Sequence, residues 1–394
     1  MTRAPVYLNQ LGIVCAMGDS PASIRERMLA GAGDCLTYTD TFSPGHQLPL
    51  GCVNTVLPSL QDCPREEQTR TNQLLAAAMQ QLRSAFEEAR AGLDPLRIGI
   101  VLGTSTGGIA EGEAAIAARE EQGTLPADFH YRQQEMAGPA EALARWLNVD
   151  GPALVISTAC SSSAKALASA RRLLRLGVCD LVIAGGVDSL CSLTVQGFMA
   201  LSAVSDKPCQ PFSVERDGIN IGEAAALFLV SKEPGPVALC GVGECSDAHH
   251  ISAPEPDGKG AAAAMALALT DAGLAPTAID YLNLHGTATA QNDRMESLAV
   301  ARILGTDVPC SSTKPYTGHT LGAAGAVEAA ICWLTLCEPA AGLPLHLWDA
   351  NRDPELAPLT LVEHGRKNAQ AKYAMSNSFA FGGNNISLIL ERSE

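Results

Sequence analysis

Three residues of the chain have side chains that could carry out chemistry together: Cys160, His285 and His319. Each stands on a loop of small residues that follows an apolar, strand-like run, in STACSSS, NLHGTAT and YTGHTLG. A thiol at the start of a helix faces free amides and the positive end of the helix dipole, so we expect a lowered pKa for Cys160. The sequence therefore predicts a thiolate nucleophile with two histidine partners.

Taken singly, each of these residues has a simpler interpretation. A cysteine between a strand and a helix is more often a small buried residue, and a lone histidine beside a glycine is more often a cap or a hydrogen-bonded core residue. Taken together, the three residues favour the catalytic interpretation over the structural one, because all of them stand on loops of the same kind. We therefore interpret them as one reactive site.

The elements that must position these loops alternate along the chain. Short apolar runs such as RIGIVLG, ALVIS, DLVIAGG and NISLIL have the length of buried strands, and Ala- and Leu-rich stretches between them are typical of helices. This alternation predicts an α/β layered fold. The stretch LVISTACSSSAKALASARRLLRLG and the stretch VPCSSTKPYTGHTLGAAGAVEAAICWLTLC show the same order of strand, small-residue loop and helix, which indicates an internal duplication.

Five motifs together resemble the β-ketoacyl-acyl-carrier-protein synthases of the KAS I and KAS II type. They are TACSSS around Cys160, PFSVERDGINIGEAAALFLV at 211–230, HGTATAQNDRMES at 285–297, KPYTGHTLGAAGAVE at 314–328 and NSFAFGGNN at 377–385. The resemblance covers nearly the whole chain and implies a thiolase-like fold of five layers, helix, sheet, helix, sheet and helix, built from two pseudo-repeated halves. We place the halves at 1–235, with the nucleophile, and 236–394, with the two histidines.

The resemblance also implies a reaction. Cys160 would take an acyl chain from an acyl-carrier-protein thioester, and malonyl carrier protein would lose carbon dioxide beside His285 and His319. The enolate would attack the acyl-cysteine in a Claisen condensation and give a 3-oxoacyl product. Two neutral histidines suit this role because their N–H groups can stabilise the developing negative charge. The backbone N–H groups of Cys160 and Phe381 would form the oxyanion hole of the acyl-cysteine.

Supporting roles follow from the same resemblance. Lys314 and Glu328 would be buried polar supports of the site, and Thr287 and Thr289 would bind the pantetheine arm of the carrier protein. Losing one member of a buried charged pair is costly, so we expect replacement of either support to reduce activity.

The acyl pocket is implied to involve three further residues. Phe379 and Phe381 would lie in the Gly-rich segment that gates the pocket, although a core position suits Phe379 nearly as well. Thr106 would stand where the pocket meets the dimer partner, and its hydroxyl would be unpaired against a saturated tail. The chain departs from the family with Ala380, where Gly is common, and with Asn384, where Thr is common.

Composition restricts the partners. The formal charge of −15 argues against nucleic-acid binding, and the thirteen cysteines contain no C-x-x-C pair, which argues against a zinc site or a redox pair. The condensation that the resemblance implies uses no metal, and the sequence has no phosphate-binding P-loop, so we expect no metal and no cofactor. The acidic carrier protein would need a local basic patch, for which Arg65, Arg70 and Lys207 are candidates. The N-terminal run suits a strand better than a signal peptide, and no run approaches the roughly 20 apolar residues of a membrane span, so we expect a soluble cytoplasmic protein.

Two other functions remain as alternatives. One is a non-catalytic, chain-length-factor-like subunit, which would lose the nucleophile, and the other is a degradative thiolase, which would carry a second cysteine where this chain has His319. The pathway is open between fatty-acid, polyketide and aryl polyene biosynthesis, and the segment at 185–213 favours the aryl polyene ketosynthases. We expect a homodimer or a heterodimer with a chain-length-factor-like subunit.

Overall fold

The computed structural model describes residues 4–363, 368 and 370–393. Its first half builds a five-stranded sheet in the order β1-β7-β6-β4-β5, in which β4 is parallel to β5 and β6. The strands are β1 (Tyr7–Val14), β4 (Ile98–Gly103), β5 (Ala153–Ile156), β6 (Leu181–Asp188) and β7 (Ala224–Ser231). The helices are α1 (Pro21–Ala30), α2 (Arg70–Ala89), α3 (Ile109–Gln122), α4 (Gly138–Leu147), α5 (Ser162–Arg175) and α6 (Ser192–Ala200). A small hairpin joins β2 (Thr37–Thr39) to β3 (Leu48–Leu50).

The second half repeats this topology in the order β8-β13-β12-β9-β10, with the short β11 added at its edge. Its strands are β8 (Val237–Ser246), β9 (Tyr281–Asn283), β10 (Pro309–Ser311), β11 (Thr360–Leu361), β12 (Tyr373–Phe379) and β13 (Asn384–Arg392). Its helices are α7 (Lys259–Ala272), α8 (Ala290–Ile303), α9 (Lys314–Thr317) and α10 (Ala324–Cys337). Since β1, β7, β6, β4 and β5 correspond in order to β8, β13, β12, β9 and β10, the duplicated arrangement is visible in the topology.

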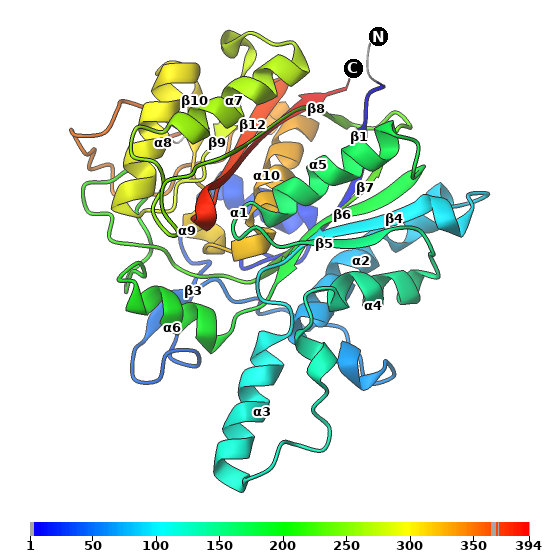
Figure 1. Ribbon diagram of the computed structural model, residues 1–394. Coiled ribbons are helices and arrows are strands. Elements are labelled where there is room, and N and C mark those ends of the chain that lie inside the picture. Colours follow the sequence, from blue (N-terminus) through cyan, green and yellow to red (C-terminus); the bar gives the residue numbers. More distant parts are fainter. Residues whose placement is uncertain (1–3, 364–367, 369, 394) are drawn as a thin grey trace.

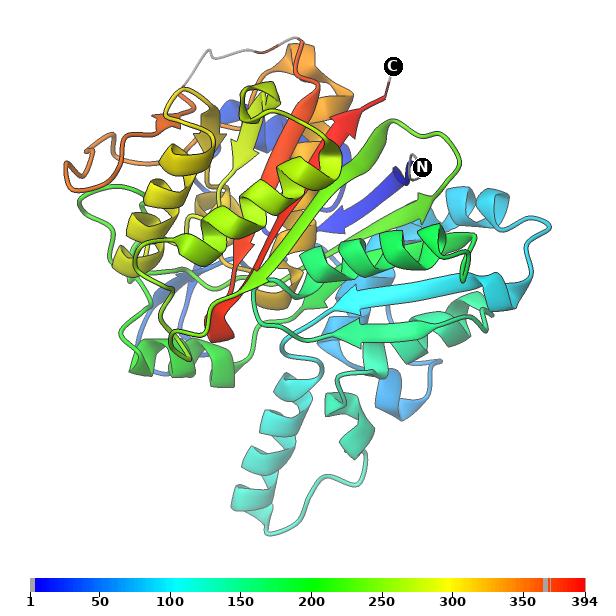
Figure 2. The same cartoon turned by 45° about the horizontal axis from the view of Figure 1, so that its top comes forward.

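The layers follow from which helices pack on which sheet. Helices α5 and α10 pack against each other between the two sheets, α2 and α4 cover the outer face of the first sheet, and α7 packs on the second sheet and beside α8 (Figures 1 and 2). The expected thiolase-like layered fold is confirmed. One short antiparallel pairing, Tyr7 with Ala238 and Leu8 with Val237, joins the two sheets into a continuous eleven-stranded sheet.

The middle layer explains why the site loops meet. Helix α10 is buried on nearly all sides, as expected for an apolar helix between two sheets. Its Gly325 packs so closely on α5 that an added Cβ would lie 2.7 Å from the Cβ of Ala164. The starts of α5 and α10 are thereby held side by side. One core cluster contains residues of both halves, so the core does not mark a boundary between them. The predicted division after residue 235 therefore stays a prediction.

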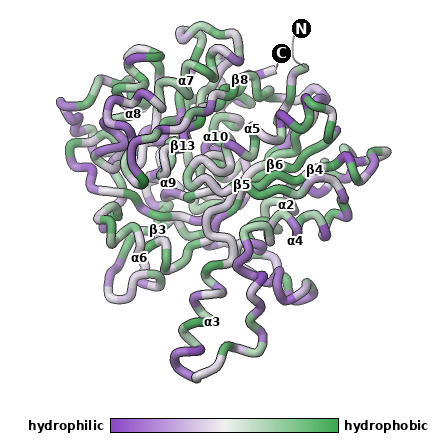
Figure 3. Tube along the Cα trace, viewed as in Figure 1, coloured by the Kyte–Doolittle hydropathy of each residue, from purple (hydrophilic) through white to green (hydrophobic). Residues whose placement is uncertain are grey.

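Strand β5 is a correction to the sequence analysis. The run ALVIS was expected to be a buried strand, but β5 is the edge strand of the sheet and the side chain of Leu154 is 46 % exposed. The neighbouring strands β4 and β6 are buried along their length, and Figure 3 shows their hydrophobic character. An apolar edge strand without a neighbour leaves unpaired backbone groups that another chain can cover.

A long excursion leaves the body of the protein near this edge. Helix α3 and the segment after it extend away from the layers (Figure 1), with Ile116, Leu125 and Tyr131 exposed. In the described part of the chain, no helix is both long and apolar enough to cross a membrane. A cytoplasmic location stays a prediction.

Candidate active site

The nucleophile candidate lies in a sharp turn between β5 and α5. Ala159 adopts a left-handed backbone conformation with φ of 50°, which is rare for a residue with a Cβ. The hydroxyl of Ser162 donates to the carbonyl of Ala159 at 2.5 Å and accepts from the amide of Thr158 at 2.9 Å. These bonds fix the turn, and they hold Cys160 directly before the first turn of α5 with 6 % of its surface exposed.

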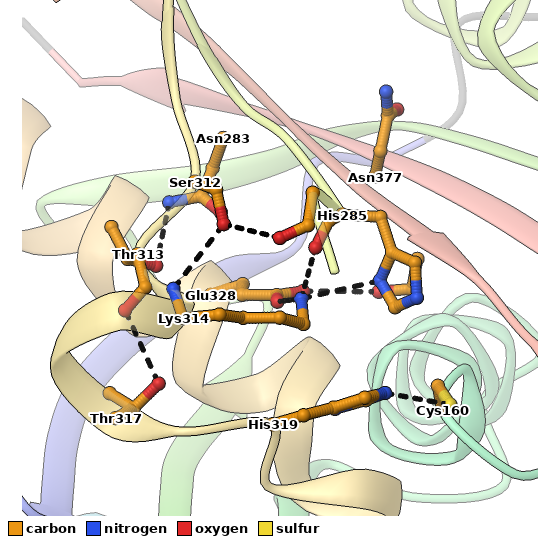
Figure 4. A network of polar contacts seen from close by, with 12 residues as sticks. Cys160, Asn283, His285, Ser312, Thr313, Lys314, Thr317, His319, Glu328 and Asn377 are labelled. Carbon is orange, nitrogen blue, oxygen red and sulfur yellow. Dashed lines mark hydrogen bonds and ion pairs between the residues drawn. The ribbon is translucent and has the colours of Figure 1, made fainter. Parts of the chain in front are cut away.

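The two histidines converge on this sulfur, as Figure 4 shows. The Nε2 atom of His319 lies 3.0 Å from the Sγ atom of Cys160, and the ring centroids of His285 and His319 are 5.4 Å apart. His319 is held through its backbone, since its amide donates to the carbonyl of Asn220 at 2.6 Å. The structure therefore brings together the three residues that the sequence analysis singled out.

A buried ion pair supports His285. The ammonium of Lys314 donates to the carboxylate of Glu328 and to the carbonyl of His285, and it lies 3.4 Å from His285 Nδ1 (Figure 4). An ammonium has no acceptor, so Nδ1 must accept and the ring proton must be on Nε2, which faces the cavity. Lys314 and Glu328 thus lie where the sequence analysis expected. Removing one of them would leave a buried charge unpaired, which costs about 3–5 kcal/mol.

Both histidines are neutral at physiological pH. Burial lowers the pKa of His285 and of His319 well below the usual range, and the charge of Lys314 lowers both further. Neutral rings with a proton on nitrogen can donate hydrogen bonds to a developing oxyanion without first losing charge.

This gives a testable pH dependence. Because the pKa of each histidine is lowered, protonation that would block the site sets in only well below pH 6.5, and we expect carbon dioxide release from malonyl carrier protein to be nearly constant between pH 7.5 and pH 5.5. With an ordinary pKa near 6.5, the rate would instead fall about tenfold at pH 5.5. The rate should be measured with saturating substrate in a buffer series of constant ionic strength, in the parent and in Glu296→Gln, because the pKa of the Glu296 carboxyl behind His285 is about 7. A fall centred near pH 6.5 in both proteins would contradict the assignment.

The pKa of Cys160 is the clearest correction. The helix start was expected to lower it, but burial raises the pKa of the thiol to about 11, against opposing effects of the Lys314 charge and the backbone amides of Phe381 and Cys160. Desolvation disfavours the thiolate more than these groups favour it. The resting residue is therefore a thiol, and its proton must leave as the sulfur attacks, so fast alkylation at neutral pH is not expected.

The same two amides are the expected oxyanion site, and that role stays a prediction. The backbone N–H groups of Phe381 and Cys160 lower the pKa of the thiol by hydrogen bonding, so both lie beside the sulfur. Phe381 opens the short helical turn η7 (Phe381–Gly383), in which Gly382 has φ of 78° and Gly383 has φ of 74°. Only glycine adopts such angles at no cost, which accounts for the Gly-Gly pair.

The trio opens into a cavity of about 480 Å³. Besides the trio itself, its lining residues include four that the sequence analysis placed in the substrate channel, namely Thr287, Thr289, Phe379 and Phe381. The ring of Phe379 is buried and stands edge-on to His285 with centroids 6.1 Å apart, whereas Phe381 is 38 % exposed at the mouth and packs on Phe198. Phe379 therefore serves both the core and the cavity wall.

Thr106 is enclosed by protein in the single chain, and its place beside a dimer partner stays a prediction. It is fully buried outside the residues that line the cavity, and its hydroxyl donates to the carboxylate of Asp188 at 2.8 Å. The premise of an unpaired hydroxyl is therefore wrong, because the buried carboxylate that satisfies it comes from β6, far away in the sequence. A bulky replacement would break this bond, so it would not test the acyl pocket cleanly.

The three candidate docking residues have separate surroundings. Arg65 pairs with Asp128, Arg70 pairs with the buried Glu223, and Lys207 lies 3.6 Å from Asp217, a residue of the cavity wall. Arg70 is committed to a structural ion pair, since Glu223 also accepts the amide of Val53 at 3.0 Å. Of the three, only Lys207 pairs with a residue of the cavity wall.

Sequence reasoning missed two buried carboxylates behind His285. Glu296 accepts the amides of His285 at 2.8 Å and Gly286 at 2.7 Å, and Asp293 accepts the amides of Phe212 and Ala288. Burial raises the pKa of Glu296 to about 7 and that of Asp293 to about 6. Their spacing of three residues at the start of α8 was the available signal, since it places both on one helix face toward the histidine loop.

The cysteine and histidine atoms could also hold a metal ion, because the three ligand atoms lie within 4.8 Å of one another. A cation there would stand next to the ammonium of Lys314, which disfavours it. The expectation that the protein uses no metal and no cofactor stays a prediction.

Comparisons with known proteins agree with this geometry. Residues 45–234 match the family described as "Beta-ketoacyl synthase, N-terminal domain", and residues 238–344 match "Beta-ketoacyl synthase, C-terminal domain". A 3-oxoacyl-[acyl-carrier-protein] synthase 2 of Synechocystis is 31% identical over 100% of this chain and 99% of its own length. The enzyme of that name from Rhizobium meliloti is 34% identical over 81% of this chain and 79% of its own length.

A solved structure is closer in sequence than these two relatives. It is a ketosynthase in complex with its chain length factor from Xenorhabdus doucetiae, which is 42% identical, has a TM-score of 0.95 and aligns over 99% of this chain and 98% of its own.

Proposed function

The chain belongs to the β-ketoacyl synthase family, and from that premise we propose how its own residues perform the family's reaction. The protein is a β-ketoacyl-acyl-carrier-protein synthase, an acyltransferase that condenses an acyl thioester with malonyl carrier protein. The single observation that carries the assignment of residues is the 3.0 Å contact between Cys160 and His319 in a buried cavity that also holds His285.

The first half of the reaction loads the enzyme. The sulfur of Cys160 attacks the thioester carbon of acyl carrier protein, and the carbonyl oxygen accepts hydrogen bonds from the amides of Cys160 and Phe381. The proton of the thiol passes to His319 Nε2, which lies in contact with the sulfur, and then to the sulfur of the departing carrier. Because this transfer accompanies the attack, the raised pKa of the thiol does not block it.

The second half extends the chain by two carbons. The malonyl carboxylate leaves as carbon dioxide, and the negative charge moves to the thioester oxygen, which accepts a hydrogen bond from the Nε2–H group of His285. His319 donates a second hydrogen bond after its ring proton has moved from Nδ1, where loading requires it, to Nε2. The enolate carbon then attacks the acyl-cysteine carbonyl, and collapse of the tetrahedral intermediate expels Cys160 as a thiolate, which takes up one proton. The products are a 3-oxoacyl carrier protein and carbon dioxide, and the atoms balance without a metal ion or nucleotide.

A mixture of acyl carrier protein and malonyl carrier protein tests the function itself. Mass spectrometry of the carrier after incubation should find a 3-oxoacyl group that is two carbons longer than the acyl group supplied. A carrier that is only deacylated, or that is decarboxylated without chain growth, would refute the condensation. The non-catalytic subunit and the degradative thiolase are not favoured, since the nucleophile and both histidines are in place.

We propose that this subunit works in a dimer formed through its first half. The exposed apolar edge of β5 and the excursion around α3 lie on the same half, and both leave apolar side chains to solvent in the single chain. The similar ketosynthase from Xenorhabdus doucetiae was solved with a chain length factor, which favours a heterodimer over a homodimer here. For the substrate class we propose an unsaturated or aryl-capped acyl chain, as in aryl polyene biosynthesis, which the segment at 185–213 supports and the paired Thr106 hydroxyl does not.

Lys207 should contribute to docking of the acidic carrier protein. Its side chain is 50 % exposed beside Asp217 of the cavity wall. The ammonium of Lys207 would therefore lie near the carrier protein when its pantetheine arm enters the cavity. We expect Lys207→Glu to raise the KM for carrier-bound substrates several-fold while leaving the KM for pantetheine thioesters unchanged, because steering acts on the carrier's charge.

Arg83→Glu is the matched control for Lys207→Glu. Arg83 is similarly exposed, at 52 %, but lies on α2 in the outer layer. Equal effects of Lys207→Glu on carrier-bound and carrier-free substrates, or an effect of the same size from Arg83→Glu, would remove Lys207 from the docking surface.

A further inference from the structure

The oxyanion turn η7 is held mainly by contacts to another loop. The amide of Gly382 donates to the carbonyl of Ile251 at 2.8 Å, and the carbonyl of Gly383 accepts from the amide of Asp247 at 2.7 Å. Both partners belong to the loop between β8 and α7, where Ile251 is exposed. These bonds place the turn relative to the second half of the protein, but the sulfur that it must serve is carried by α5 of the first half.

One side-chain hydrogen bond connects the turn to the nucleophile's own helix. The ammonium of Lys165, in the first turns of α5 and five residues after Cys160, donates to the side-chain oxygen of Asn384 at 2.9 Å. Asn384 directly follows Gly383, and its backbone carbonyl accepts the amide of Ala380 at 3.0 Å, which closes the turn around Phe381. The bond therefore joins the two elements that carry the two oxyanion amides.

The hydrogen-bond partner of Lys165 is unusual for a half-buried lysine. Its partner is a neutral amide and not a carboxylate, so the charge of Lys165 is not neutralised by Asn384, although the side chain is half-buried. Burial and the neighbouring Arg172 lower the pKa of Lys165. A charged donor makes a stronger hydrogen bond to an amide oxygen than a neutral donor does. The bond thus offsets part of the cost of holding the lysine in this place.

The identities of the neighbouring residues fit this contact. Ala380 has extended backbone angles, φ of −111° and ψ of 153°, so the position needs no glycine. Asn384 has a side chain long enough to present a carbonyl oxygen to Lys165, and it occupies the position at which threonine was expected from the family resemblance. The departures noted in the sequence are therefore compatible with a closed turn that is tied to α5.

We propose that Lys165, through its hydrogen bond to Asn384, is a positioning residue that holds the Phe381 amide at the acyl group on Cys160. This inference rests on the proposed function and adds a residue that touches neither substrate nor sulfur. Acyl transfer to and from Cys160 depends on the Phe381 amide, whereas decarboxylation of malonyl carrier protein depends on His285 and His319. Loosening the turn should therefore slow the first process and spare the second.

The test compares these two processes in Lys165→Met and in the parent. We expect the rate constant for acylation of Cys160, followed by intact-protein mass spectrometry after rapid mixing with acyl carrier protein, to fall about tenfold. This is less than the 10²–10³-fold loss on removing an oxyanion donor outright, because the amide is displaced and not deleted. Carbon dioxide release from malonyl carrier protein should stay within about twofold of the parent, since decarboxylation does not use this donor.

Three further variants make the result specific. Lys165→Arg keeps a charged donor and should restore most of the acylation rate. Asn384→Ala should reproduce the loss, and the double variant Lys165→Met/Asn384→Ala should be no slower than either single variant, because both remove the same bond. Arg172→Met is the matched control, since this cation lies further along α5 and pairs with Glu244.

The outcomes separate cleanly. A Lys165→Met enzyme that is acylated as fast as the parent, or one that loses acylation and decarboxylation equally, overturns the positioning role. Additive losses in the double variant overturn it as well. A parent enzyme that takes up no acyl group would instead refute the proposed function.

Discussion

Replacing Cys160 by Ala is expected to abolish acyl transfer and condensation, with a loss on the order of 10³-fold or more, because among the described residues that line the cavity it alone has a thiol. The change removes one sulfur atom from a site that opens into a cavity, so little new void is created and the fold should persist. The acyl-enzyme should be sought by intact mass, and product formation by analysis of the carrier.

Cys179→Ala is the control for this variant, since Cys179 is also buried but lies just before β6, away from the cavity. It should retain acylation. Both variants should unfold within a few degrees of the parent. Condensation that survives in Cys160→Ala would rule out this residue as the nucleophile.

Replacing His285 or His319 by Ala is the second large effect that we expect. Carbon dioxide release from malonyl carrier protein should fall on the order of 10²-fold or more in each variant, because each ring donates to the oxygen on which negative charge develops. Acylation of Cys160 should fall much less in His285→Ala, since its oxyanion is held by the backbone amides of Cys160 and Phe381. In His319→Ala acylation should fall as well, because His319 takes up the proton of the thiol.

The exposed His249 supplies a control, and His249→Ala should leave both rates unchanged. If either histidine variant decarboxylates at the rate of the parent, that histidine is structural. If acylation and decarboxylation fall together in His285→Ala, the assignment of decarboxylation to this ring and of acylation to the amides is wrong.

The reactive trio could be predicted from sequence because its members stand on loops of small residues at the ends of strands. Parallel strands with a shared topology bring such loops to one place. The family could be identified because several of its motifs occur in the chain in the expected order. The supports Lys314 and Glu328 were predicted through the family resemblance, and the structure places them in a buried ion pair beside His285. These are properties of local sequence and of strand order.

The wrong predictions share a different cause. The pKa direction of Cys160 depends on how much protein covers the sulfur, and the partner of the Thr106 hydroxyl is a carboxylate from another strand. The exposure of Leu154 depends on which strand forms the sheet edge. Tertiary burial and distant partners decide each of these, and local sequence does not specify them.

For the same reason, the contacts of Glu296 and Lys165 with the site loops could not be predicted. Glu296 and Lys165 both lie on helices whose pattern identifies them as helices, but their partners are the backbone of a histidine loop and the side chain of Asn384. The fold of the second half brings Glu296 to the His285 loop, and the packing of the two halves brings Lys165 to Asn384.

The fate of the malonyl carboxylate tests the central claim most directly. Malonyl carrier protein labelled with carbon-13 in its free carboxyl group should be incubated with acyl-loaded enzyme, and the released gas and the carrier-bound product should be measured together. We predict that the label appears in carbon dioxide, with one molecule released for each unlabelled 3-oxoacyl carrier formed. Label retained in the product, or product formed without release of carbon dioxide, would contradict decarboxylative condensation at Cys160.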